Sequence, residues 1–130
     1  MAATVTRTTK NVRGSWHCQY NIVETGIEDT TETTITGVPE FGTIVTFYSV
    51  FVSGTGSAVK PELGSSSGWT TNDINQVLPE PGSAATLIRD LTRTPYHAPD
   101  GILYLRSQPN NTATDHTVHT KILIVTGFKV

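Results

Sequence analysis

The residues best suited to chemistry in this sequence are histidines that stand close to a carboxylate or a thiol. Asp115, His116 and His119 lie within five residues of one another, and imidazole with carboxylate can hold a divalent metal ion. Residues three apart on a strand point to opposite faces, however, so we expect the two histidines to diverge. His17 and Cys18 are strand neighbours and diverge for the same reason. The sequence therefore predicts no metal site, no cofactor and no thiol–base pair.

A second candidate is the serine motif Gly-Ser-Ser-Ser-Gly at residues 64–68. It matches the Gly-x-Ser-x-Gly pattern of hydrolases, in which a tight turn between a strand and a helix presents the serine. That turn needs an apolar strand before it and a parallel α/β sheet, whereas Ser66 follows a stretch rich in Ser and Gly. We therefore expect a loop here, no catalytic residue, and a protein that is not an enzyme.

Aromatic residues near two predicted turns give a third candidate. Trp69 follows the Ser/Gly stretch and Tyr96 lies in a turn-rich passage. Together they can form a platform on which a sugar ring or a nucleobase stacks. The alternative is that Trp69 packs back on Val77 or Leu78. Trp69 and Tyr96 are therefore the candidate residues of a carbohydrate-binding module.

Composition narrows the class of protein. The chain has 130 residues, enough for one domain; charged residues make up 15%, and Thr alone fills 23 positions, which is typical of β-sheet proteins. The net charge of −2 gives no general attraction for nucleic acid or an anionic membrane. The single cysteine, Cys18, excludes an intrachain disulfide. The apolar run of residues 44–52 is too short to span a bilayer, and residues 1–13 lack the apolar centre of a secretion signal.

Alternating residues predict several strands. Trp16, Cys18, Tyr20 and Ile22 alternate with polar neighbours, which predicts a half-buried strand with Cys18 facing the core. The β-branched segment 30–36, interrupted by Glu32, predicts an edge strand. Further strands are expected over residues 102–106 and 116–126.

The segment 41–59 carries no charged side chain, and its strand predicts two mostly apolar faces. Ile44, Thr46, Tyr48, Val50 and Val52 share one face, while Val45, Phe47, Ser49 and Phe51 share the other. Such a strand is either central in a sandwich or turns one apolar face toward another subunit.

Between these strands the sequence predicts a loop and short helices. Residues 53–68 are rich in Ser and Gly and predict a long surface loop. Thr71 or Asn72 can cap a helix that runs to Leu78, and the spacing of residues 84, 87, 88 and 91 favours a second helix after Ser83, although 87–93 also fits a strand. The predicted fold is all-β, or β with one or two short helices, arranged as an antiparallel sandwich or jelly roll.

Charged residues are unevenly placed along the chain. Residues 1–13 carry basic side chains and no acid, and residues 24–40 carry acids and no base. The first thirteen residues therefore read as an extended basic arm, and residues 14–130 as one sandwich domain. The arm can pair with the acidic region within the chain or in a neighbouring subunit. The candidate partner contacts are Arg7, Lys10, Arg13, Glu28, Asp29 and Glu32.

In size, composition and strand layout the chain resembles the head decoration, or cement, proteins of tailed phages. The resemblance includes the Thr-rich start, Thr4-Val5-Thr6-Arg7-Thr8-Thr9, and the apolar end, Lys121-Ile122-Leu123-Ile124-Val125-Thr126. It implies a non-enzymatic virion protein on the capsid surface, which forms a homo-oligomer such as a trimer and clamps neighbouring major capsid subunits. The short helices expected in the middle would fit a phage tail tube or head-completion protein equally well.

Overall fold

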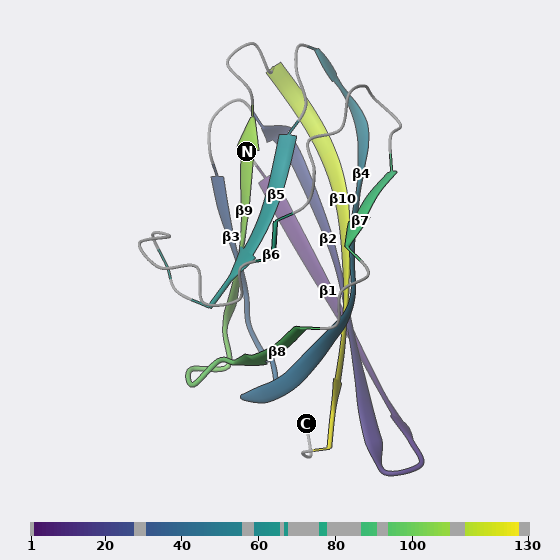
Figure 1. Cartoon of the computed structure of the whole chain (residues 1–130). Coiled ribbons are helices and arrows are strands. Elements are labelled where there is room, and N and C mark those ends of the chain that lie inside the picture. Colours follow the sequence, from purple (N-terminus) through teal and green to yellow (C-terminus); the bar gives the residue numbers. More distant parts are fainter. Residues whose placement is uncertain are drawn as a thin grey trace.

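The computed structural model describes residues 2–27, 31–55, 59–65, 67, 76–77, 87–90, 94–109 and 114–127. These residues form two antiparallel β-sheets, which confirms the prediction of an all-β sandwich (Figure 1). The strands are β1 (Ala2–Val12), β2 (Ser15–Ile27), β3 (Thr31–Ile35), β4 (Phe41–Thr55), β5 (Val59–Gly64), β6 (Gln76–Val77), β7 (Leu87–Asp90), β8 (Thr94–His97), β9 (Leu103–Pro109) and β10 (Thr114–Thr126).

The two sheets differ in width. The larger sheet has the strand order β1-β2-β10-β4-β7, and β8 also pairs with β4; the smaller sheet has the order β3-β9-β5-β6. β1 and β3 are therefore edge strands, and the predicted edge position of the segment around Glu32 is confirmed. β10 lies between β2 and β4, so the apolar C-terminal strand is central in the larger sheet.

The core lies between the sheets and follows the alternation that the sequence shows. On β2, Cys18, Tyr20 and Ile22 are buried, as predicted, and Trp16 packs against them. The smaller sheet faces them with Leu63, Leu103 and Leu105, all fully buried. Burial of these side chains is the main favourable term in folding.

The predicted faces of β4 are confirmed over residues 46–50 and wrong at Ile44, because the strand contains a bulge. Leu123 pairs with Thr46 and the next residue of β10, Ile124, pairs with Ile44, so Val45 is an extra residue. The bulge moves Ile44 to the inner face with Phe47 and Ser49, all buried. Thr46, Tyr48 and Val50 stay on the outer face and are half-buried.

The helix predicted to run to Leu78 is wrong where the structure describes it, and of the two alternatives for residues 87–93 the strand is confirmed over Leu87–Asp90. Leu87–Asp90 forms β7 and pairs with β4, and Gln76–Val77 forms β6 and pairs with β5. Hydrogen bonding to an existing strand outweighs a helical pattern that depends on a few apolar residues. The remaining residues of both predicted helices lie outside the described part of the chain.

The predicted loop over residues 53–68 contains strand instead. β4 continues to Thr55, and β5 begins at Val59 and pairs with both β9 and β6. Pro61 and Leu63 alternate toward the core and are buried. Leu63 supplies apolar burial that the overall Ser and Gly content of the segment conceals.

The basic arm is a strand, and a tight turn joins it to the sandwich. Arg13 and Gly14 both have positive φ, 52° and 88°, which is the conformation of a type I′ hairpin turn. The Gly14 N–H also donates a hydrogen bond to Asn11 Oδ1 at 3.2 Å. The turn directs β1 antiparallel to β2 along its whole length.

Replacing Arg13 by Asn is expected to stabilise the protein by up to about 1 kcal/mol. Arg is strained at positive φ, whereas Asn followed by Gly is the preferred pair in this turn. Thermal unfolding of the variant measures the gain, and Arg13→Ala, which keeps the strain, is the control. A variant with Asn that is no more stable than the Ala variant would contradict this account of the turn.

Candidate assembly interface

β1 is a strand whose side chains take no part in the core. Every residue from Ala2 to Val12 is exposed, although each of them pairs with a residue of β2. Arg7 pairs with Tyr20 and Lys10 pairs with His17. Because paired residues point to the same side of a sheet, Arg7 lies on the inner face with Tyr20 and Lys10 lies on the outer face.

The backbone of β1 has a free edge. The turn bond joins Val12 to Ser15, and hydrogen-bonded pairs alternate from there along an antiparallel ladder. The even-numbered residues of β1 therefore bond to β2. The N–H and C=O groups of the odd-numbered residues point away from β2, where the described sheet ends; they belong to Ala3, Val5, Arg7, Thr9 and Asn11.

The smaller sheet leaves most of the inner face of β1 uncovered, although the Arg7 side chain lies against Gly37 in the segment after β3. Glu24 on β2 reaches Thr33 on β3 and Ser107 on β9, which places β2 opposite these two strands. β1 lies one strand beyond β2 on the side away from β10, and its inner-face residues Val5 and Thr9 are exposed. The larger sheet thus extends past the smaller one by an exposed strand.

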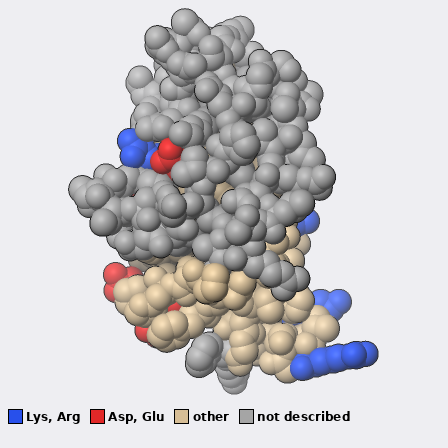
Figure 2. Space-filling model, in the orientation of Figure 1, with Lys and Arg blue, Asp and Glu red and all other residues tan. Residues whose placement is uncertain are grey.

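The structure does not gather the predicted partner residues that it describes into one patch. Arg7 and Lys10 lie on opposite faces of β1, and Arg13 is in the turn. Glu32 lies on β3, an edge strand of the smaller sheet, where its Oε1 accepts a hydrogen bond from Ser67 Oγ at 2.9 Å. Glu28 and Asp29 lie outside the described residues. Figure 2 shows Lys and Arg side chains projecting at the lower right, where Figure 1 places the β1–β2 turn, and both acidic and basic side chains toward the left.

Arg7 also acts on the residues beneath it. Burial raises the pKa of Tyr20 to about 12; the neighbouring Cys18 adds to this effect, and the Arg7 guanidinium opposes it. The pKa of Cys18 is likewise raised by burial and lowered less strongly by Arg7. Tyr20 therefore stays protonated and donates a hydrogen bond to the Gly37 carbonyl at 2.8 Å. The Cys18 thiol is fully buried and protonated, which makes it an inert core residue, as predicted.

The outer face of β4 and β10 is the second candidate contact surface. Tyr48 and Val50 line a shallow open depression with Val23, His119 and Lys121. Lys121 Nζ lies 6.0 Å from the centre of the Tyr48 ring. Val52, further along β4, is 41% exposed. The sequence left open whether one apolar face of this strand, not specified further, turns toward another subunit.

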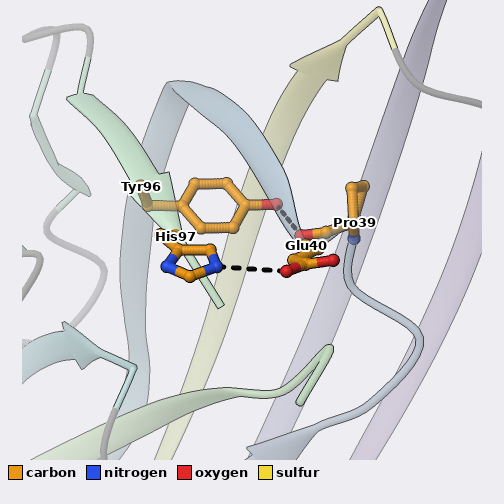
Figure 3. Close-up of polar contacts among 4 residues, drawn as sticks. All are labelled: Pro39, Glu40, Tyr96 and His97. Atoms are coloured by element: carbon orange, nitrogen blue, oxygen red, sulfur yellow. Dashed lines mark hydrogen bonds and ion pairs between the residues drawn. The ribbon is translucent and has the colours of Figure 1, made fainter. Parts of the chain in front are cut away.

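Of the two aromatic candidates, the structure describes Tyr96, whose ring is buried. Tyr96 is 7% exposed, and its hydroxyl donates a hydrogen bond to the Pro39 carbonyl at 2.8 Å (Figure 3). Its ring is therefore part of the core. The neighbouring His97 points to solvent, stacks on Phe41 with 4.4 Å between ring centres, and places Nε2 3.2 Å from Glu40 Oε1. Trp69 and Ser66 lie outside the described residues.

The histidine candidates diverge, as the strand pattern predicted. His116 is fully buried, whereas His119 is exposed on the outer face of β10. Asp115 lies in β10, beside His116 in the chain. Among the residues that the structure describes, no group of three or more His, Cys, Asp or Glu side chains could hold a metal ion.

Glu24 has a buried carboxyl group that the sequence analysis did not single out. Glu24 was counted there only among the acids of residues 24–40. Glu24 is 0% exposed, and its two oxygens accept hydrogen bonds from Thr33 Oγ1 at 2.9 Å and Ser107 Oγ at 2.8 Å. Burial raises the pKa of Glu24, and the hydrogen bonds from Ser107 and Thr33 oppose this rise. The alternation of β2 could have indicated this burial, because Glu24 continues the buried series of Cys18, Tyr20 and Ile22.

Replacing Glu24 by Gln is expected to flatten the dependence of stability on pH. A pKa raised above its ordinary value of 4.5 means that the folded protein binds this proton more tightly than the unfolded chain does. Stability is then fully present below the ordinary value and falls as pH rises through the folded pKa. Gln carries no charge, so its amide keeps polar contacts to both hydroxyls without this loss.

Urea unfolding at a series of pH values measures the effect, and the difference between the two proteins isolates Glu24. As pH rises above the ordinary pKa of 4.5, the free energy of unfolding should fall more steeply in the wild type than in Glu24→Gln. Glu40→Gln, which changes an exposed carboxyl, is the matched control. Parallel curves for wild type and Glu24→Gln would contradict the assignment.

Comparisons of the chain with protein families, with curated proteins and with solved structures find no match. No helix in the described part of the chain is long and apolar enough to cross a membrane. The fold and the exposed edge therefore define the protein only by its architecture. It is a two-sheet antiparallel β-sandwich with an exposed N-terminal edge strand.

Proposed function

We propose that this protein is a non-enzymatic structural protein that joins a larger protein assembly, as a decoration or cement protein on the surface of a virion. The observation that carries the proposal is β1, which is ordered along eleven residues and buries none of them. Fixing a residue costs about 1–2 kcal/mol of conformational entropy. β1 recovers only part of this cost by side-chain burial, since its two valines, Val5 and Val12, stay 36% and 38% exposed, so a partner that covers it would complete its stabilisation.

The outer face of the larger sheet supports self-association. Tyr48, Val50 and Val52 offer partly exposed apolar surface on a central strand, and apolar surface of this kind is typical of protein contacts. A homo-oligomer formed through this face, a trimer for example, would leave the β1 edges free for a major capsid protein. A phage tail tube or head-completion protein would use the same two surfaces.

Two measurements test this function. Light scattering on the purified protein should detect a homo-oligomer, and co-sedimentation with capsids from the same source should show saturable attachment. Attachment to tails or to unfilled heads would instead select the tail tube or head-completion alternative. A strictly monomeric protein that attaches to none of these particles would overturn the proposal.

One of the two residues proposed for carbohydrate binding is not accessible to a ligand. The ring of Tyr96 is buried, so stacking would rest on Trp69 alone. No described feature of the chain favours this alternative over assembly.

A further inference from the structure

The free edge of β1 offers more than an exposed surface. Its outward backbone groups, spaced at every second residue from Ala3 to Asn11, are those that an additional strand would bond. Unpaired edges of this kind accept extended segments from partner proteins. The side chains of Ala2–Val12 are all exposed to solvent, although the Arg7 side chain also lies against Gly37 on the inner face.

Charge decides which partner fits. Residues 2–13 carry Arg7, Lys10 and Arg13 and no acid. If β1 paired with the β1 of a second copy in the antiparallel sense and in full register, the two Arg7 side chains would face each other at the centre of the strand. Like charges directly opposite each other are destabilising, whereas opposite charges contribute favourably. A second copy is therefore a poor occupant of this edge, and an acidic segment is a good one.

We propose that β1 binds an extended acidic segment of its partner, which adds as a further strand at the edge of the larger sheet. Arg7 and Lys10 are three residues apart and lie on opposite faces. The segment should therefore carry carboxylates three residues apart, one for each face. This inference rests on the proposed function and names the chemistry of its partner.

A synthetic peptide of alternating Thr and Val tests the inference directly. The binding peptide carries two Glu residues three positions apart; the control has the same composition with its two Glu residues two positions apart, on one face. We expect the first peptide to bind about fivefold more tightly, the equivalent of one cross-strand charge pair of about 1 kcal/mol. Titration calorimetry on the full chain measures both affinities.

Substitutions separate strand addition from general charge attraction. Thr9→Pro removes one outward N–H and keeps the bonds from β1 to β2, because Thr9 is one of the odd-numbered residues. Its control is Thr9→Ala. Arg7→Glu and Lys10→Glu should each weaken binding about fivefold, while Lys60→Glu, an equal charge change on β5 of the smaller sheet, should not.

The outcomes are distinct. Equal binding of the two peptides, or a Thr9→Pro variant that binds as well as Thr9→Ala, would overturn the inference. Association of the protein with itself that Thr9→Pro abolishes would also overturn it, because a second copy would then occupy the edge. If these tests fail while the protein still attaches to capsids, the proposed function stands without this partner chemistry. If the acidic peptide binds but the protein attaches to no particle, the proposed function is wrong and the inference about the β1 edge stands.

Discussion

Replacing Tyr96 by Ala is expected to lower the free energy of unfolding by about 3–5 kcal/mol, the usual cost of removing a buried aromatic side chain. Tyr96 packs tightly on Gly42: a Cβ placed on that glycine would lie 3.1 Å from Tyr96 Cε1. Its hydroxyl also holds the Pro39 carbonyl in the segment that crosses from β3 to β4. The substitution removes both the packing and the link between the two sheets.

Chemical unfolding measures this loss, and two variants locate its origin. Tyr96→Phe keeps the ring and loses only the hydrogen bond, so it should cost about 1–3 kcal/mol. His97→Ala changes the adjacent residue, whose side chain is 52% exposed, and should cost far less. If Tyr96→Ala and His97→Ala were equally stable, Tyr96 would not be the core residue described here.

Deleting residues 2–12 should abolish attachment to the proposed assembly and leave the sandwich folded. No side chain of β1 is buried, so its loss removes little of the apolar burial that stabilises the protein. The free energy of unfolding should therefore fall much less than in Tyr96→Ala. Removal of the basic edge strand should, in contrast, eliminate attachment.

Co-sedimentation and urea unfolding of the shortened protein measure these two effects separately. Tyr96→Phe is the opposite control, because it should be less stable than wild type and still attach normally. A shortened protein that attaches as well as the full chain would show that β1 is not the attachment strand. One that fails to fold would show that β1 has a structural role that its exposure does not explain.

Much of the fold could be predicted from alternation alone. The inward side of β2 followed from Trp16, Cys18, Tyr20 and Ile22, and the edge position of β3 followed from Glu32 within a β-branched segment. The same alternation also covered Glu24, but its acidic character placed it with surface charges. Its burial depends on Thr33 and Ser107, which are distant in sequence and supply the two hydrogen bonds.

The elements that sequence reasoning missed depend on long-range pairing. The bulge at Val45 exists because β10 pairs with β4 on both sides of it, and no local pattern indicates this. β5 and β7 each pair with strands already in place, so a Ser/Gly-rich segment and a helix-like pattern became strands.

The sequence could predict which residues make up the β1 edge, but not how they are arranged. The basic arm and its residues Arg7, Lys10 and Arg13 were visible in the sequence. Its pairing with β2 was not, because the I′ turn contains Arg13 where Asn or Asp is the usual signal. Which face each basic residue occupies follows only from the register with β2.

Residue-resolved hydrogen exchange of the β1 amides tests most directly whether this strand is an assembly edge. In the free protein, the amides of Ala3, Val5, Arg7, Thr9 and Asn11 should exchange rapidly, because they point away from β2, and the even-numbered amides between them should exchange more slowly. In the native assembly, the rapid set should become protected as the partner strand bonds to it. Odd-numbered amides that exchange equally fast in the free and assembled protein would contradict the account.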